Sequence, residues 1–487
     1  MEQQANYIEF LFHEELVRIN FDEEKQLSPT TTVLEWLRSL DDYKAVKEAC
    51  AEGDCGACTI VLVELQNGKL KYRSLTSCIL FLPYLNGKQL ITLEHLSPRV
   101  ARLASLHPVQ KAVANHQASQ CGYCTPGIVM SLFSFYKNKE SEDDIATSLS
   151  GNLCRCTGYE SIRKAAIEVS HLPDMEDDFD RREDDIVQRL KEMNDAKIPF
   201  SVKSYYQAQE LQDALVYKND HPDSVLIGGA SDIALLKTKK HQEIPFLLDL
   251  SQIGEMRQIA KNEDYWEIGA SARIEDIRKE LSNQWPDFAA ILNVFASKQI
   301  RNVATLGGNI GSASPIGDLL PLLISHQAEI VIQSKDDTRT EQLQDFILAY
   351  KKTSLMPNEI ITKVLIPIDK QWFYWSEKVS KRKQLDISTL SVAFSVRLTK
   401  NNKISSIVLA YGGMAAMPVR AHQAEEYLLG KKSNRENFNQ AAELIKKEFE
   451  PLSDARASKE GRSLLASNLL IKFYYEIDKK YSITSPS

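Results

Sequence analysis

Eight cysteines are the residues whose type and spacing most clearly point to chemistry in this 487-residue chain. All of them lie between residues 50 and 156, and no cysteine follows in the rest of the sequence. Cysteines grouped in this way in a reducing compartment are more often ligands of metals or clusters than disulfide partners. Their spacing divides them into two quartets. The first quartet comprises Cys50, Cys55, Cys58 and Cys78, and the second comprises Cys121, Cys124, Cys154 and Cys156.

The first quartet has the spacing Cys-x4-Cys-x2-Cys, with its fourth member on a later segment. This is the plant-type [2Fe–2S] spacing. Three thiolates on one loop must wrap an anionic cluster with backbone N–H groups turned toward the sulfurs, which requires small residues, and Gly53 and Gly56 supply them. A zinc site with four cysteine ligands is the alternative. Structural zinc usually takes two Cys-x2–4-Cys pairs, so the cluster is favoured.

The second quartet consists of two close pairs, Cys-x2-Cys and Cys-x-Cys, on separate segments. Spacing alone permits zinc here. Each pair adjoins the predicted start of a helix, however, and the positive end of a helix dipole favours anionic sulfur ligands. Two such helix ends would clamp a cluster between them, and this favours a cluster over zinc at the second quartet as well.

The elements that must position these cysteines change character along the chain. Alternating apolar residues, Asn-Gly turns and a Thr-x-x-Glu capping box predict an α+β unit up to about residue 90. From about residue 95 to 170 the apolar period becomes helical, with prolines at two predicted helix starts. The predicted elements are strands Ile8–Leu11, Leu16–Asn20 and Thr59–Leu65, a capped helix from Thr32, and helices starting near Pro108, Pro126, Glu142 and Ser161.

An acidic stretch at residues 174–185 predicts a solvated linker, although a helix from Ile186 to Met193 is left open. From Phe200 the pattern becomes α/β, and after Tyr374 it predicts a further α+β domain. The predicted elements are strand and turn Ser224–Gly229, helix Ile233–Leu236, strands Ser391–Leu398 and Ile404–Gly412, and helices Ala421–Leu429 and Asn437–Glu448.

Composition excludes several classes of function. Lys and Arg number 59 against 66 Asp and Glu, a net charge of −7, which disfavours broad binding to nucleic acid. No apolar run is long enough to span a membrane, and the N-terminal residues lack a signal-peptide pattern, so we expect a cytoplasmic protein. The nine histidines form no metal motif, and no arrangement typical of a catalytic nucleophile is present.

Two glycine pairs in the second half, Gly228-Gly229 and Gly307-Gly308, allow backbone N–H groups to approach a pyrophosphate closely. Neither pair has the Rossmann spacing Gly-x-Gly-x-x-Gly. Two such turns in one domain indicate a dinucleotide bound between two lobes.

With these motifs in view, the chain resembles the iron–sulfur/FAD (small) subunits of bacterial xanthine dehydrogenases, in the molybdenum hydroxylase family. The resemblance covers nearly the whole chain, in family order, and the cysteine motifs are its most specific part. The matching strings are Cys50–Cys58, Leu106–Gln110, Ser119–Met130, Gly151–Tyr159, Phe295–Asn309 and Ser314–Pro321.

The resemblance implies a multidomain α+β chain. The implied domains are a β-grasp plant-type [2Fe–2S] ferredoxin domain (1–92), an all-α four-helix [2Fe–2S]-binding domain (93–172), an acidic linker (173–197), an α+β FAD-binding domain (198–372) and a C-terminal α+β domain like that of CO dehydrogenase flavoproteins (373–487).

The resemblance also implies cofactor contacts. Tyr350 matches a position near the NAD⁺ nicotinamide, although ordinary packing is an open alternative, and Gln120 matches a glutamine that contacts the pterin of the partner's cofactor. Some relatives have Asn-Thr-Glu where this chain has Ala230-Ser231-Asp232, which keeps the acid only. The positions that match FAD contacts are Leu226, Ile227, Gly228, Gly229, Ala230, Ser231, Asp232, Ile233, Phe295, Ala296, Thr305, Gly308, Asn309, Asp318, Ile361 and Lys378.

By resemblance, the molybdopterin cofactor lies on a separate large subunit that oxidises hypoxanthine or xanthine to urate, in a heterotetramer of two small and two large subunits. Electrons then pass through the second and the first [2Fe–2S] cluster to FAD and NAD⁺, and no catalytic residue is expected in this chain. One alternative is an aldehyde or N-heterocycle hydroxylase with another acceptor. Another, of a different class, is a zinc-stabilised assembly protein without redox function.

Overall fold

The computed structural model describes residues 4–97, 105–173, 176–195, 198–202 and 204–482. The chain divides into two compact units. The first unit comprises Met1–Ala214, Asp223–Gly254 and Ser297–Ala304, and the second comprises Leu215–Pro222, Glu255–Ala296 and Thr305–Ser487.

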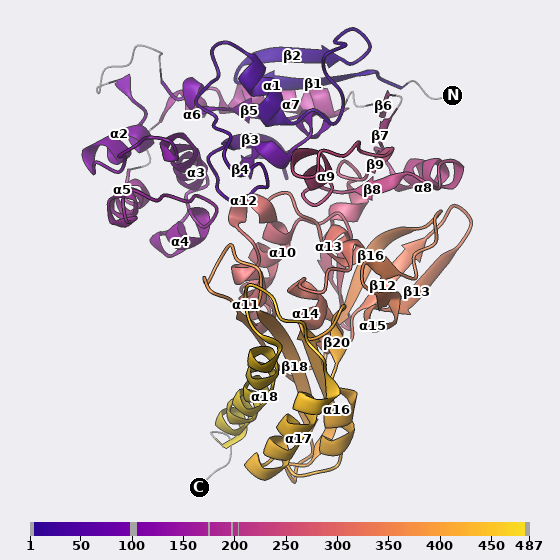
Figure 1. Ribbon diagram of the computed structural model, residues 1–487. Helices are drawn as coiled ribbons and strands as arrows, with labels where there is room; N and C mark the ends of the chain where they lie inside the picture. The colour runs from indigo at the N-terminus through magenta and orange to yellow at the C-terminus, as the bar shows by residue number, and fades with distance from the viewer. Residues whose placement is uncertain (1–3, 98–104, 174–175, 196–197, 203, 483–487) are drawn as a thin grey trace. The chain divides into compact units, whose positions relative to one another are not determined.

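The first unit begins with a five-stranded mixed sheet of β-grasp type, drawn in indigo in Figure 1. Helix α1 (Val33–Ser39) packs on it, and the predicted capping box is confirmed, because Thr32 Oγ1 accepts from the Glu35 N–H and the Glu35 carboxylate accepts from the Thr32 N–H. The outer strand pairs are antiparallel hairpins, and β1 pairs with β5 in parallel. In sheet order the strands are β2 (Glu15–Asn20), β1 (Tyr7–Phe12), β5 (Gln89–Ile91), β3 (Thr59–Gln66) and β4 (Lys69–Thr76).

The next part of the first unit is helical, as predicted. Its helices pack around an apolar core that includes Ile128, Phe133, Ala165 and Val169. The predicted helix near Glu142 is a 3₁₀ turn that leads into a short α-helix. The helices are α2 (Pro108–Asn115), α3 (Thr125–Lys137), α4 (Ile145–Ser148) and α5 (Glu160–Ser170).

The predicted acidic linker contains two helices, α6 (Asp178–Arg181) and α7 (Glu183–Asp195), so the helix left open by the sequence is present. Its apolar side is buried rather than solvated, because Ile186 and Leu190 pack against Leu11 of the β-grasp sheet. The acids lie mainly on the exposed side. Residues 174–175 and 196–197 of the predicted linker lie outside the described residues.

A second sheet of the first unit has the order β6-β7-β9-β8, with parallel pairing of β7 and β8 to β9. Ile227 at the end of β8 and Ala234 at the start of α9 share one apolar core with Cys58 and Cys78. The elements are β6 (Phe200–Val202), β7 (Tyr205–Gln207), β8 (Val225–Ile227), α9 (Ala234–Thr238) and β9 (Leu247–Asp249), with α8 (Leu211–Asp220) between β7 and β8 in sequence. The short helix α12 (Lys298–Arg301) completes this unit.

The second unit contains an antiparallel five-stranded sheet and a set of helices. The sheet strands, in order, are β10 (Ile259–Lys261), β11 (Tyr265–Gly269), β16 (Ile360–Pro367), β12 (Glu329–Gln333) and β13 (Thr338–Gln342). The helices and the small hairpin are α10 (Ile274–Leu281), α11 (Pro286–Val294), α13 (Leu306–Ser312), α14 (Leu319–Ser325), α15 (Leu343–Phe346), β14 (Ile347–Ala349) and β15 (Lys352–Thr353).

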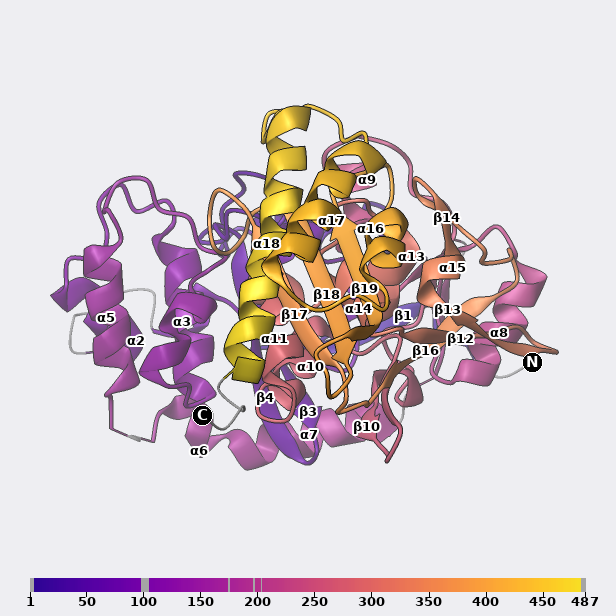
Figure 2. The same ribbon diagram turned by 90° about the horizontal axis from the view of Figure 1, so that it is seen from below.

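The C-terminal part of the second unit is an antiparallel sheet with the C-terminal helices on one face, as Figure 2 shows. Phe394 and Phe438 belong to the core between them, while Ser395, on the opposite face of the sheet, donates to the Ser325 carbonyl at the end of α14. No helix among the described residues is both long and apolar enough to cross a membrane. The elements are β17 (Phe373–Val379), β18 (Leu390–Leu398), β19 (Ile404–Gly412), β20 (Val419–Arg420), α16 (His422–Leu428), α17 (Arg435–Glu448) and α18 (Lys459–Ser482).

Candidate functional site

The first cysteine quartet lies on the loop before β3 and on the 3₁₀ turn after β4. Cys58 and Cys78 are buried, whereas the other two thiols of the quartet are partly exposed. Gly53 and Gly56 have φ values of +84° and +69°, which a glycine adopts without strain. The backbone N–H of Cys55 donates to the Cys50 sulfur at 3.4 Å. The predicted orientation of backbone N–H groups toward the sulfurs is therefore present in this loop.

The four thiols of the first quartet contact one another. Cys50 hydrogen bonds with Cys55 and Cys78, and Cys58 hydrogen bonds with Cys78. These hydrogen bonds lower the pKa of Cys50 and of Cys58, and they raise the pKa of Cys55 and of Cys78. These contacts bring Cys78, the member on the later segment, to the loop that holds the other three thiols.

The second quartet forms two thiol pairs, each with one member from either segment. Cys121 contacts Cys156, and Cys124 contacts Cys154. Cys124 is the residue just before α3, so its sulfur lies at the predicted helix start. A hydrogen bond from the Tyr123 N–H lowers the pKa of Cys121, and a hydrogen bond with the Cys156 thiol contributes less in the same direction. Burial raises the pKa of Cys124 to about 12.

Three glycines allow the loops of the two quartets to touch. A Cβ atom on Gly56 would lie 2.1 Å from the Gly151 carbonyl oxygen, and one on Gly127 would lie 2.0 Å from the Gly56 carbonyl oxygen. Leu153, the residue before Cys154, donates its N–H to the Cys55 carbonyl at 3.0 Å. A single backbone hydrogen bond therefore connects the loop of the first quartet to the segment that holds Cys154 of the second quartet.

The arrangement of the thiols fits two-iron clusters. The thiols of the second quartet meet in pairs, and a [2Fe–2S] cluster takes two thiolates on each of its two irons. A structural zinc would take all four thiolates on one centre. The paired thiols of the second quartet are compatible with such a cluster.

The predicted FAD-binding and C-terminal domains (residues 198–487) are called the flavin half here. Its first glycine pair lies in the turn between β8 and α9. A Cβ on Gly229 would lie 1.9 Å from the Val303 carbonyl oxygen, so only glycine fits at this turn. Ala230 has a φ of +56°, and the Ala234 N–H donates to its carbonyl to begin α9. Asp232 and Ser231 of the same turn are at least partly exposed to solvent. The turn offers accessible backbone and polar groups to a ligand.

The second glycine pair begins α13. Thr305 caps this helix, because its hydroxyl accepts from the Gly308 N–H at 3.2 Å. A Cβ on Gly307 would lie 2.7 Å from the Ala270 side chain. The Asn309 Oδ1 atom is buried and has no hydrogen-bond partner among the described residues. Buried acceptors are nearly always paired, so this one fits a position where a bound ligand donates.

Asp318 and Lys378, both predicted to contact FAD, form a buried ion pair at 2.7 Å. Ser388 donates to the other oxygen of Asp318, and Lys378 also donates to the Val294 carbonyl at 3.1 Å. Burial raises the pKa of Asp318 despite the neighbouring cation. The pair therefore holds the ammonium group of Lys378, which lies on β17, in a fixed position within the second unit.

The remaining predicted site residues are distributed along the elements of both units. Phe295 and Ala296 follow α11, and Ile361 is buried on β16. Tyr350 lies in the turn between β14 and β15 with 59% of its surface exposed, and Gln120 is exposed directly before the second quartet. Exposure leaves both side chains free to meet a ligand or another chain.

Three side chains to which the sequence assigned no role take part in these sites. Asn152 and Gln299 form a buried hydrogen-bonded pair beside the two quartet loops, and Ser388 completes the Asp318 pair. Asn152 and Gln299 lie far apart in sequence, and the local pattern around each resembles an ordinary turn or helix. Only the folded chain shows that they meet.

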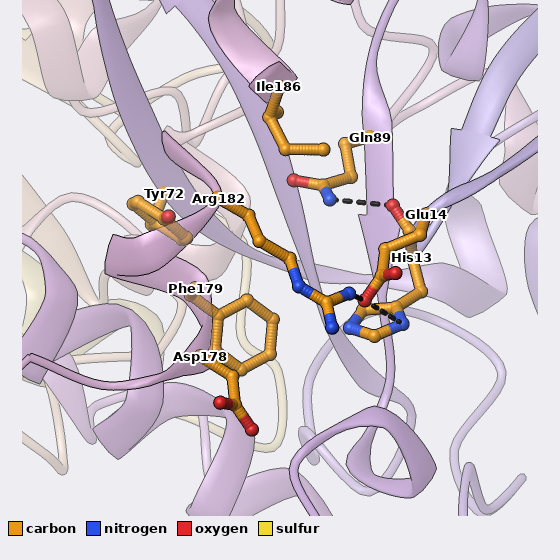
Figure 3. A pocket seen from close by; sticks show the side chains of 8 residues that line it. All are labelled: His13, Glu14, Tyr72, Gln89, Asp178, Phe179, Arg182 and Ile186. Carbon is orange, nitrogen blue, oxygen red and sulfur yellow. Dashed lines mark hydrogen bonds and ion pairs between the residues drawn. The ribbon is translucent and has the colours of Figure 1, made fainter. Parts of the chain in front are cut away.

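A small pocket lies elsewhere in the first unit, between the β1–β2 turn and helices α6 and α7 (Figure 3). Arg182 pairs there with Glu14, and Gln89 donates to the His13 carbonyl at 2.6 Å. The pocket marks where the linker helices cover the β-grasp sheet. Its lining consists of His13, Glu14, Tyr72, Gln89, Asp178, Phe179, Arg182 and Ile186.

Comparison with known families agrees with this geometry. Residues 92–167 match a [2Fe-2S] binding domain, 198–369 match an FAD binding domain in molybdopterin dehydrogenase, and 375–477 match a CO dehydrogenase flavoprotein C-terminal domain. The chain is an iron–sulfur flavoprotein by its domains. It belongs to the molybdenum hydroxylase family.

Xanthine dehydrogenases are among its relatives. The chain is 32% identical to the xanthine dehydrogenase of Emericella nidulans over 468 residues, which cover 83% of this chain and 34% of that protein. It is 29% identical to xanthine dehydrogenase 1 of Arabidopsis thaliana, over 91% of this chain and 38% of the relative. The chain therefore spans little more than a third of the length of these relatives.

Solved structures share the fold. Carbon monoxide dehydrogenase from Hydrogenophaga pseudoflava matches with a TM-score of 0.52 and 24% identity, covering 57% of this chain and 96% of the matched chain. Quinoline 2-oxidoreductase from Pseudomonas putida 86 matches with a TM-score of 0.51 and 24% identity, covering 57% and 98%. At this identity the likeness supports the fold alone.

Proposed function

We propose that this chain is the electron-transfer subunit of a xanthine dehydrogenase. In this proposal a separate large subunit carries the molybdopterin cofactor and oxidises hypoxanthine and xanthine to urate, and two copies of each subunit form a heterotetramer. This chain passes the electrons to NAD⁺. The relatives named xanthine dehydrogenase, which are much longer than this chain, support the choice of substrate.

The observation that carries the proposal is the continuity of sites within the first unit. The second quartet adjoins the first through the hydrogen bond from Leu153 to Cys55. Cys58 and Cys78 of the first quartet then share an apolar core with Ile227, at the first glycine turn of the flavin half. The sites therefore follow one another in the order second quartet, first quartet and first glycine turn. In this proposal electrons follow the same order.

The side chains would act as ligands and as an electrostatic frame. When bound, each cluster carries one electron at a time, and the flavin collects two and releases them as a hydride. The eight thiolates would hold the irons. Backbone N–H groups such as that of Cys55 would donate to sulfur, and the Thr157 hydroxyl, 3.1 Å from the Cys154 sulfur, would do the same in the second quartet.

The residues predicted to contact FAD would have different roles in binding it. The glycine turns would let backbone N–H groups approach the pyrophosphate, and Asn309 Oδ1 would accept from the ligand. Lys378, held by Asp318, would place positive charge for a reduced, anionic flavin. Exposed Tyr350 would meet the nicotinamide and exposed Gln120 the partner's pterin.

The first experiment measures the cofactors of the purified chain. We expect broad absorption bands at roughly 400–550 nm, with about four irons and about one FAD per chain, because two quartets hold two irons each. Spectra and iron, zinc and flavin analyses give the answer. A colourless protein with two zinc ions would contradict the proposal and support a non-redox assembly protein.

The second experiment tests the reaction with the partner subunit present. The two chains are produced together, and reduction of NAD⁺ is followed with xanthine or hypoxanthine. We expect NADH formation with both purines. Turnover of an aldehyde or of an N-heterocycle other than these purines, or reduction of O₂ or a quinone in place of NAD⁺, would move the chain to the related hydroxylases.

A further inference from the structure

Residues 297–304 lie within the predicted FAD-binding domain, but they fold as part of the first unit. This segment, which contains α12, contacts the loops of both quartets. Ile300 lies against Gly53 in the loop of the first quartet, where a Cβ atom on the glycine would be 2.8 Å from the Ile300 Cδ1 atom. Gln299 lies against Gly151, close to the second quartet. A piece of the flavin half is thus inserted beside two loops that precede it by more than a hundred residues.

Gln299 is the central side chain of this contact. It is fully buried, and its Nε2 atom lies within hydrogen-bond distance of three acceptors. The acceptors are the Ser131 hydroxyl at 3.0 Å, the Ser148 carbonyl at 3.0 Å and the Asn152 Oδ1 atom at 3.1 Å. The Ser131 hydroxyl in turn donates to the same Asn152 oxygen at 2.6 Å. Two donors therefore fix the orientation of the Asn152 carboxamide.

Asn152 uses the other end of that carboxamide to hold the first quartet. Its Nδ2 atom donates to the Gly56 carbonyl at 3.2 Å and to the Thr59 hydroxyl at 3.2 Å. Gly56 lies between Cys55 and Cys58, and Asn152 itself lies two residues before Cys154. One carboxamide therefore connects the two ligand loops, and Gln299 sets its orientation.

We propose that Gln299 is a positioning residue for electron transfer between the two quartet sites, acting through Asn152. This inference rests on the proposed function. Transfer moves one electron from one cluster to the other, with no bond made or broken, so the protein controls it through the separation and orientation of the two loops. The Gln299–Asn152 contact fixes both, alongside the backbone hydrogen bond from Leu153 to Cys55. The flavin half thereby contributes to the cluster geometry through its own sequence.

The test uses the full chain with Gln299→Met, which keeps the side-chain length and removes the donors. The matched control is Gln188→Met on α7, where the glutamine is exposed and donates to Glu192. Reduction by dithionite and electron paramagnetic resonance report the magnetic interaction between the two reduced clusters. Rapid photoreduction reports the rate of electron exchange between them, and iron and flavin analyses report loading.

For Gln299→Met we expect wild-type iron and FAD content, an altered magnetic interaction and a slower exchange of electrons between the clusters than in the wild type. The control should match the wild type. If Gln299→Met showed the wild-type interaction and the wild-type rate, the positioning role would be overturned.

A second variant keeps the test decisive if Gln299→Met loses its iron. Ser131→Ala removes only one of the two donors to Asn152, so we expect full loading with a smaller change of the same sign. A loaded Ser131→Ala protein with wild-type behaviour would also overturn the inference. Wild-type protein without iron would instead overturn the proposed function itself, and iron analysis distinguishes the two failures.

Discussion

His13, which lines the pocket in Figure 3, stacks on His95 with ring centroids 4.8 Å apart and an interplanar angle of 6°. The Thr92 N–H donates to the His95 Nδ1 atom at 3.0 Å, so this nitrogen is an acceptor and the ring is neutral. Burial, and to a lesser extent His13, lowers the pKa of His95 to about 3. Burial and then Arg182 lower the pKa of His13, against the opposing charges of Asp178 and Glu15.

This pair makes stability depend on pH in a defined direction. An unfolded histidine binds its proton near pH 6.5, whereas folded His95 stays neutral to much lower pH. Its contribution to stability is therefore complete above pH 6.5 and decreases as the pH falls, by about 2 kcal/mol at pH 5. We expect His95→Gln to remove that part of the pH dependence, measured by denaturant unfolding at pH 7 and pH 5.

The control for His95 is His171→Gln, because the His171 side chain is 66% exposed. That variant should keep the wild-type difference between the two pH values. If the unfolding free energy of His95→Gln changed between pH 7 and pH 5 as much as that of the wild type, the stacked pair would not be the source of this pH dependence.

At the scale of elements, α12 depends on a buried ion pair with the helical part of the first unit. Lys298 pairs with Glu140, and their side chains are only 4% and 8% exposed. Lys298 also donates to the Ser148 hydroxyl at 2.9 Å, and that hydroxyl donates to Glu140 at 2.6 Å. Three polar groups thus share one buried site where α12 meets α4.

Lys298→Met should be strongly destabilising, because it leaves the Glu140 carboxylate buried without this cation. Removal of one partner from a buried pair costs about 3 to 5 kcal/mol. Unfolding free energies of the first unit give the measurement. Lys164→Met is the control, since Lys164 and Glu160 are 58% and 62% exposed and a surface pair contributes about 1 kcal/mol or less. In the double variant Lys298→Met/Glu140→Gln much of the loss should be recovered, and equal losses in single and double variants would argue against the pair.

Local patterns predicted many individual elements well, although no individual element was predicted between residues 237 and 390. The capping box at Thr32, the hairpins and the start of α2 at Pro108 depend on neighbouring residues, so the sequence contains all the information they need. Strand β19 was predicted as Ile404–Gly412, the range that the structure shows. Helix α18 was missed, although it is the longest helix among the described residues and buries Ala466, Leu470 and Phe473 at helical spacing.

Contacts between distant residues could not be predicted in this way. The pairing of thiols within the second quartet, the burial of Ile186 on the β-grasp sheet and the insertion of α12 all depend on which segments meet in space. The grouping of the cysteines into two quartets was visible in their spacing, and their role as cluster ligands stays a prediction. Gln299 carries no such mark, since a glutamine in a helix is usually a surface residue.

At the scale of the whole molecule, the predicted cofactor ligands are divided unequally between the two units. All eight cysteines belong to the first unit, and the apolar cores of the C-terminal sheet belong to the second. Because each unit has its own core, we expect thermal unfolding in more than one step rather than a single two-state transition. Ligands that bind only the native state stabilise the part of the chain that holds them.

Removal of iron should therefore act on one unit. A chelator with dithionite would release the metal, and calorimetry would compare the treated and untreated proteins with FAD supplied in excess to both. We expect the transition of the first unit to move to much lower temperature, since metal binding at such sites is coupled to folding. The transition of the second unit should stay in place, as should far-ultraviolet signals from its sheets. If both transitions shifted together, the two units would unfold as one cooperative block. The prediction that iron stabilises only the first unit would then be wrong.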